Sequence, residues 1–366
     1  MGIHDRSVAK LAGGARDAGR GEAPVWAPAS LWLPLGGAAA LLLVALALGV
    51  AIGSVYIAPE AALRLLLARA GLAPFPADLP ASLERILLDI RLPRVALIAL
   101  AGAALSCSGA AYQGLFRNPL ADPYLIGVAA GAGLGAISVI TLQSAGALIA
   151  SPLAVPAGAF GGALVAVLVV YRLGSVGWYA GATTLILAGV AVGAIASSLS
   201  TYLMIRGGQQ VTRVLTFLLG GYGGAGWSAV FVVAPVALAG IAALHLCARP
   251  LNLLLFGEEQ AQRLGVDVRR ARLVIVVAAT LTTAAAVAFA GLIGFVGLVA
   301  PHTARLLVGA DHRRVMPLAT LGGAAFLVLA DLVARTAAAP QELPLGVVTA
   351  VAGAPFFLYL LRRTRG

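Results

Sequence analysis

The sequence predicts an all-α polytopic membrane protein with about ten transmembrane helices. Of its 366 residues 61% are apolar and only 11% are charged, whereas a soluble domain carries about 25% charged residues. The mean hydropathy is +0.98. The apolar runs have helical periods or are uniformly apolar, without the alternation of a membrane β-barrel. Lipid must therefore cover much of the surface, and a soluble fold is excluded.

Ten apolar runs account for the predicted spans. The first run is longer than the apolar core of a signal peptide, so we expect the mature chain to retain it. Residues 1–30 before it are polar and basic and are predicted to form a cytoplasmic tail, and 31–366 form a single transmembrane domain. The runs cover roughly 31–53, 92–113, 125–142, 153–172, 184–205, 228–248, 271–291, 292–308, 316–334 and 345–361.

The charge distribution orients the chain. An even number of spans puts both termini on one side, and placing them in the cytoplasm puts most basic residues there, as the positive-inside rule requires. The net charge of +11 comes from basic residues scattered between the spans rather than from one patch, which argues against nucleic-acid binding. Both cysteines, Cys107 and Cys247, lie in apolar runs and predict neither a disulfide nor a metal cluster.

Glycines spaced four apart predict close helix packing, because the missing side chains let two backbones approach. They occur in three successive spans, at Gly127, Gly131 and Gly135, at Gly158 and Gly162, and at Gly189 and Gly193.

Two segments interrupt the pattern of spans. Between Ile205 and Trp227, glycine-rich polar clusters flank a short apolar stretch, which predicts a half-helix. Residues 251–272 form the longest cytoplasmic loop and predict two short helices, the first with Glu258 and Glu259 near its N-terminus.

No enzyme site is evident in the sequence. A rhomboid-like serine motif is absent around Ser108, and Asp331 is the one acid deep in a span, with Arg335 four residues later as an internal partner. A Walker motif is also missing. We expect a transport subunit that is not an ATPase itself and holds no stably bound cofactor or metal.

Residues 91–135, RLPRVALIALAGAALSCSGAAYQGLFRNPLADPYLIGVAAGAGLG, resemble the FecCD-like permease subunits of type II ABC importers, which take up ferric siderophores, haem and cobalamin. The resemblance continues through 185–193, 251–268, 291–317, 329–335 and 342–361. It implies a multi-pass protein of the bacterial inner membrane that forms a homodimer. It also implies two copies of a separate ATPase subunit, which binds the ATP, and a periplasmic substrate-binding protein.

The resemblance assigns roles to individual residues. Arg91, Arg94 and Arg335 match arginines that dock the binding protein, and Thr183 and Leu185 are the gate candidates at the start of the fifth span. The 251–272 loop would be the coupling element that contacts the ATPase, through Gly257, Glu258, Glu259, Gln262, Arg263, Leu264 and Gly265.

The segment GGQQVTRVLTF resembles haem permeases. Arg206 and Arg213 would present guanidinium groups to the haem propionates at the periplasmic mouth, since arginine pairs well with carboxylates. Haem, or another iron chelate, is thus the expected cargo. A ferric siderophore and cobalamin remain alternatives, and a secondary transporter unrelated to ABC importers would need coupling-ion ligands beyond Asp331.

Overall fold

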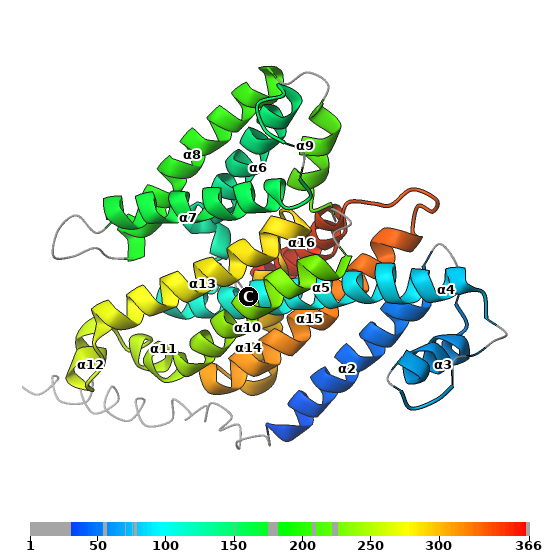
Figure 1. Ribbon diagram of the computed structural model, residues 1–366. Helices are drawn as coiled ribbons and strands as arrows, with labels where there is room; N and C mark the ends of the chain where they lie inside the picture. Colours follow the sequence, from blue (N-terminus) through cyan, green and yellow to red (C-terminus); the bar gives the residue numbers. More distant parts are fainter. Residues whose placement is uncertain are drawn as a thin grey trace, which may run out of the picture. The chain divides into compact units, whose positions relative to one another are not determined.

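The computed structural model describes residues 31–53, 57–69, 71–74, 76, 79–149, 151–174, 182–206, 210–221 and 226–363. The predicted tail 1–30 lies outside these residues. The described helices (Figure 1) are α2 (Trp32–Ala51), α3 (Pro59–Arg69), α4 (Ala81–Arg85), the π-helix η1 (Ile86–Arg91), α5 (Leu92–Leu115), the 3₁₀ helix η2 (Pro123–Ile126), α6 (Val128–Ser144), α7 (Ala154–Gly174), α8 (Ala182–Arg206), α9 (Val211–Leu218), α10 (Gly226–Leu246), α11 (Ala248–Leu254), α12 (Glu258–Arg263), α13 (Val268–Ala290), α14 (Val296–Val308), α15 (His312–Thr336) and α16 (Leu345–Arg363).

The all-helical prediction is confirmed for the described residues. Seven helices are long and apolar enough to cross a membrane. Three shorter apolar helices, Val128–Ser144, Val296–Val308 and Leu345–Tyr359, bring the number of apolar helices in the described chain to ten. The predicted break between the seventh and eighth spans is present, because α13 ends at Ala290 and α14 begins at Val296.

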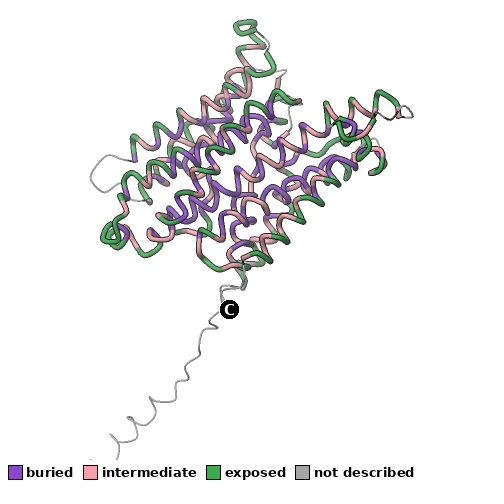
Figure 2. The backbone as a smooth tube through the Cα atoms, turned by 60° about the horizontal axis from the view of Figure 1, so that its bottom comes forward, coloured by how far each residue is buried: buried purple, intermediate pink, exposed green. Residues whose placement is uncertain are grey.

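Helix α5 is the centre of the packing. Together with α4 and η1 it forms one continuous apolar helix, Ala81–Leu115. In the 18-residue stretch used to judge its hydropathy, 83% of the residues are buried inside the protein. The same measure is 17% for α2 and 22% for α8, so these helices present most of their surface outward. Figure 2 shows the buried residues inside the bundle and exposed ones along its outer helices. Exposed apolar side chains on the outer helices are suited to contact with lipid.

Glycines bring α5 against two later helices. A Cβ atom on Gly102 would collide with the backbone of Gly323 in α15, and one on Gly109 would collide with Gly297 in α14. Beside the first contact, the Ser106 hydroxyl donates a hydrogen bond of 2.8 Å to the Ala319 carbonyl. At this separation only glycine fits, so backbone contact rather than side-chain interdigitation joins these helices.

The predicted glycine packing is confirmed between α6 and α7. A Cβ atom on Gly131 would lie 2.5 Å from both the Gly162 carbonyl oxygen and the Ala166 Cβ. One turn further along α6, a Cβ atom on Gly135 would collide with Gly158.

The other glycines of the pattern behave differently. Gly127 caps the start of α6 at φ 85°, and Gly189 in α8 contacts the backbone around Leu125. A Cβ atom on Gly193 would make only an ordinary contact, with the Ala130 Cβ at 3.8 Å.

The end of α9, the end of α13 and the start of α16 meet at one place. The predicted half-helix is present as α9, and its end accepts a 3.1 Å hydrogen bond at Phe217 O from Leu292 N, just beyond α13. The start of α16 joins them, since Gly346 N donates to Leu219 O at 2.9 Å. Irregular backbone is tolerated at membrane depth where it is buried and its polar groups are paired.

Replacing Gly131 with valine should destabilise the protein by about 2 kcal/mol, the usual cost of overpacking a tight contact. The thermal unfolding midpoint in detergent measures the effect. Gly161→Val on α7 is the matched control, because nothing lies within 4 Å of the Cβ position at Gly161. Equal midpoints for the two variants would contradict the close α6–α7 packing.

Candidate functional site

The 251–272 loop forms a sharp corner between α11 and α13. Gly257 precedes α12 with φ 105°, and Gly265 follows α12 with φ 84°. Both values are favourable only for glycine. The predicted first helix with acids in its first turn is confirmed as α12. The predicted second short helix is not separate, because residues from Val268 onward belong to α13, whose first turn is capped by Asp267 accepting from Arg270 N.

The loop is attached firmly to the rest of the bundle. Leu254 and Ala261 are buried, at 4% and 0% exposure. Glu258, at the start of α12, forms an ion pair with Arg272 in α13. These contacts tie α12 to α13 and to the rest of the bundle.

Hydrogen bonds between Asn252 and residues Asp311 and His312, which we call the Asn252 latch, join α11 to the start of α15. The side-chain oxygen of Asn252 accepts from His312 N at 2.8 Å, and its amide nitrogen donates to Asp311 at 2.5 Å. Partial burial raises the pKa of Asp311, but hydrogen bonds from Arg313 N–H and Asn252, with the charges of Arg313 and Arg314, outweigh it and leave the pKa below its usual value. The carboxylate therefore stays ionised at neutral pH.

The outer surface of the loop combines apolar and charged side chains. Phe256 is 73% exposed and Leu264 is 57% exposed. Glu259, Gln262 and Arg263 are exposed beside them. Exposed apolar side chains rimmed by polar ones are typical of a protein contact surface.

The opposite end of α15 carries a cluster of charges that we call the arginine cluster: Arg91, Arg94, Asp331, Arg335 and Glu342. Asp331, with 2% of its side chain exposed, pairs with Arg94 and with Arg335, each at 2.9 Å. Arg94 also pairs with Glu342 at 2.9 Å. The internal Asp331–Arg335 pair expected from the sequence is confirmed. Nothing in the sequence predicted that Arg94 would also pair with Asp331.

Two of these arginines hold the end of α2. Arg91 donates hydrogen bonds of 3.0 and 2.9 Å to the Val50 and Ala51 carbonyls, and Arg335 donates to the Gly49 carbonyl at 3.0 Å. The last carbonyls of a helix lack intrahelical partners and carry partial negative charge, so cations are favourable there.

The three arginines expected to dock a binding protein are thus brought together, but mainly inside the chain. Arg91 is 4% exposed and Arg335 is 6% exposed. Arg91 donates to the end of α2, and Arg335 donates to α2 and pairs with Asp331. The Arg94 side chain is 12% exposed and forms an ion pair with Glu342, whose side chain is 54% exposed.

The gate candidates lie on different faces of α8. Thr183 is exposed, whereas Leu185 is 3% exposed and packs against Gly174 of α7. Leu185 therefore faces α7, whereas Thr183 faces outward.

The arginines expected at the mouth are both exposed. Arg206, at the end of α8, donates to the Tyr202 hydroxyl at 3.3 Å and lies over its ring. Arg213 in α9 donates to the Gln143 side chain at 3.2 Å. Neither arginine is buried in an ion pair, so both guanidinium groups remain accessible to an anion.

These features define a multi-pass, all-helical membrane protein with the fold of a type II ABC importer permease. A solved ABC transporter of the metal-chelate type, in an inward-facing conformation, superposes with a TM-score of 0.77 at 27% identity, covering 90% of this chain and 98% of that one. Residues 41–363 match the FecCD transport family. The chain belongs to this family and is an ABC importer permease.

Relatives within the family have different names. The chain is 43% identical over 290 residues to the cobalamin import system permease protein BtuC of Halobacterium salinarum, covering 79% of this chain and 77% of that protein. It is 38% identical over 290 residues to the hemin transport system permease protein HmuU of Yersinia pestis, covering 76% and 84%. An uncharacterised ABC transporter permease of Bacillus subtilis, YvrB, is 42% identical over 330 residues, covering 89% and 92%.

Replacing Asp331 with asparagine should destabilise the protein by about 3 kcal/mol, because two buried guanidinium groups lose their shared counter-charge. Thermal unfolding in detergent tests this. Glu342→Gln is the control, since the side chain of Glu342 is 54% exposed and an exposed ion pair contributes about 0–1 kcal/mol. An Asp331→Asn variant as stable as this control would contradict the role of the arginine cluster.

Proposed function

We propose that this chain is the transmembrane subunit that moves haem from the periplasm to the cytoplasm of a bacterial cell, driven by ATP hydrolysis on a separate subunit. The observation that carries the proposal is the 251–272 loop. It is tied to α13 by the Glu258–Arg272 ion pair, exposes an apolar and charged surface, and is joined by Asn252 to the start of α15.

The 251–272 loop is the proposed contact with the ATPase. Phe256 and Leu264 supply apolar area, and Glu259 and Arg263 supply charges that fix the orientation of the partner. Movement of the ATPase subunits would pull on α12. The Glu258–Arg272 pair and the Asn252 latch would pass that movement to α13 and α15.

A second copy of the chain is the proposed neighbour of α8. This helix buries little of its surface within one chain and carries hydroxyl groups among its exposed residues. Covering this face with a second α8 would enclose a path between the two copies, with Thr183 near one end. The exposed hydroxyl-bearing residues are Thr183, Thr184, Ser197, Ser198, Thr201 and Tyr202.

Docking of a periplasmic binding protein is proposed at the surface above the arginine cluster. Arg94 and Glu342 are the members that a partner could reach, and Arg91 and Arg335 would act by holding the end of α2 in position. Charge pairing at such a surface should weaken as the salt concentration rises.

Haem is favoured as cargo by the exposed guanidinium groups of Arg206 and Arg213. In a dimer, two copies of each would face the two propionates, and arginine binds carboxylates with planar, paired hydrogen bonds. The similarity to a cobalamin permease favours cobalamin as the second candidate.

The chain should import haem only when reconstituted with its ATPase subunit, its binding protein and ATP. Proteoliposomes tested in parallel with haem, a ferric siderophore and cobalamin measure the preference. Faster uptake of either alternative would assign that cargo instead, with the ABC mechanism unchanged. Uphill haem uptake by the chain alone would contradict the proposal as a whole.

Replacing Leu264 with alanine should reduce the amount of ATPase that co-purifies by about tenfold, the effect of losing about 1.4 kcal/mol of apolar contact. Leu246→Ala is the matched control, because Leu246 is 83% exposed on α10 outside the loop. In a separate measurement, substitution of Glu259 or Arg263 should lower transport-coupled ATP turnover. The ATPase contact would be wrong if Leu264→Ala and Leu246→Ala retained equal amounts of ATPase.

A further inference from the structure

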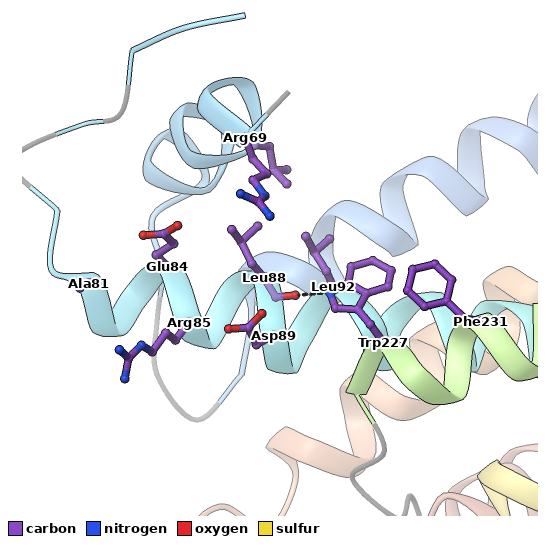
Figure 3. A pocket seen from close by; sticks show the side chains of 10 residues that line it. Arg69, Ala81, Glu84, Arg85, Leu88, Asp89, Leu92, Trp227 and Phe231 are labelled. Atoms are coloured by element: carbon purple, nitrogen blue, oxygen red, sulfur yellow. Dashed lines mark hydrogen bonds between the residues drawn. The ribbon is translucent and has the colours of Figure 1, made fainter. Parts of the chain in front are cut away.

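A hollow of about 850 Å³ lies on the flank of the bundle, where α3, the α4–η1 segment and α10 meet (Figure 3). It contains none of the residues assigned above to transport. Its lining residues are Leu66, Arg69, Ala81, Glu84, Arg85, Leu88, Asp89, Leu92, Trp227 and Phe231.

The wide turn of η1 shapes this hollow. Here Leu92 N donates to the Leu87 carbonyl, five residues back, instead of to the carbonyl four residues back. Such π-turns are rare and frequently occur at functional sites.

The shift in register leaves one carbonyl without a helical partner. The π-pattern would pair the Leu88 carbonyl with the nitrogen of residue 93, but that residue is Pro93, which has no N–H. The Trp227 indole N–H takes this place and donates to Leu88 O at 2.7 Å. The bond fixes the first turn of α10 against η1 and holds the indole ring at the edge of the hollow.

One side of the hollow is apolar and continuous with the outer surface of α10. Trp227 and Phe231 stack with ring centroids 6.0 Å apart, and Figure 3 shows the two rings side by side, with Leu88 and Leu92 next to them. Phe231 is 71% exposed on a helix that is a candidate membrane span. Tryptophan at the end of a span is typical of the lipid–water boundary, so this side faces acyl chains.

The other side carries two positive and two negative side chains, Arg69, Arg85, Glu84 and Asp89. Within the described ranges none of these four side chains forms an ion pair or hydrogen bond. In Figure 3 Arg69 descends from α3 on the same side of the α4–η1 helix as Glu84, whereas Arg85 and Asp89 extend from the other side of that helix. The hollow thus offers partners for a cation and an anion together, at the edge of an apolar surface.

We propose that this hollow binds one zwitterionic phospholipid with a primary amine in its headgroup, of the phosphatidylethanolamine class. The phosphate would pair with Arg69 and the ammonium with Glu84, with Arg85 and Asp89 at the opposite edge of the hollow, and an acyl chain would lie along Phe231. An anionic lipid would satisfy the arginines but would leave the two carboxylates unpaired and repelled by its charge. The proposal depends on the membrane location of the chain and not on its cargo.

Native mass spectrometry of the full-length chain, delipidated in detergent, tests the site. With equal amounts of phosphatidylethanolamine and phosphatidylglycerol, we expect one phosphatidylethanolamine to be retained preferentially. The double variant Glu84→Gln/Asp89→Asn should lower the affinity for it about tenfold relative to phosphatidylglycerol, as expected for lost charge-assisted hydrogen bonds. Arg69→Gln should weaken the binding of both lipids.

Arg64→Gln is the matched control, because Arg64 is exposed on the same helix and pairs with Glu60 outside the hollow. It should leave lipid retention unchanged, and thermal unfolding of every variant verifies folding. Equal retention of the two lipids by the unmodified chain, or no retention of either, would overturn the proposal. So would unchanged retention by the double variant, or protection of Arg69 and Glu84 from chemical labelling by the periplasmic binding protein instead of lipid.

Discussion

The structure depends on the backbone contact between α5 and α15. Gly102 and Gly323 bring the two helices together, and the Ser106 hydroxyl bonds to the Ala319 carbonyl beside them. Lipid removes most of the hydrophobic driving force between helices, so close packing and buried hydrogen bonds must hold the bundle together. Because α5 also meets α14 at Gly109, one helix organises the core.

Helix α15 connects the two ends of the bundle. Its first residue is bonded to Asn252 of α11, and its last turns carry Asp331 and Arg335. At 1.5 Å per residue these ends are about 35 Å apart. Helix α15 thus connects the Asn252 contact to the arginine cluster and, through Arg335, to the end of α2. Such a connection makes coupling between the ends physically possible.

Sequence reasoning was most successful where one local signal was sufficient. The apolar runs located the ten apolar helices, the glycine-rich stretches flanked α9, and Gly257 with two following acids marked α12. It missed α3 and α4, which are too short to register as spans. It also missed the π-turn of η1, whose Leu88 carbonyl is paired with the distant Trp227.

Composition, hydropathy and the glycine spacing by themselves determined the fold class, the number of apolar helices and the position of the exposed loop, because these follow from local periodicity and from the requirements of lipid. The tertiary structure alone decided which arginines are available. Arg91 and Arg335 have the charge and spacing expected of surface residues, yet they are buried on the α2 carbonyls and Asp331. Asp331 is only four residues from Arg335, but the α2 carbonyls are far away in sequence from both arginines, and only the folded chain brings them within hydrogen-bonding distance.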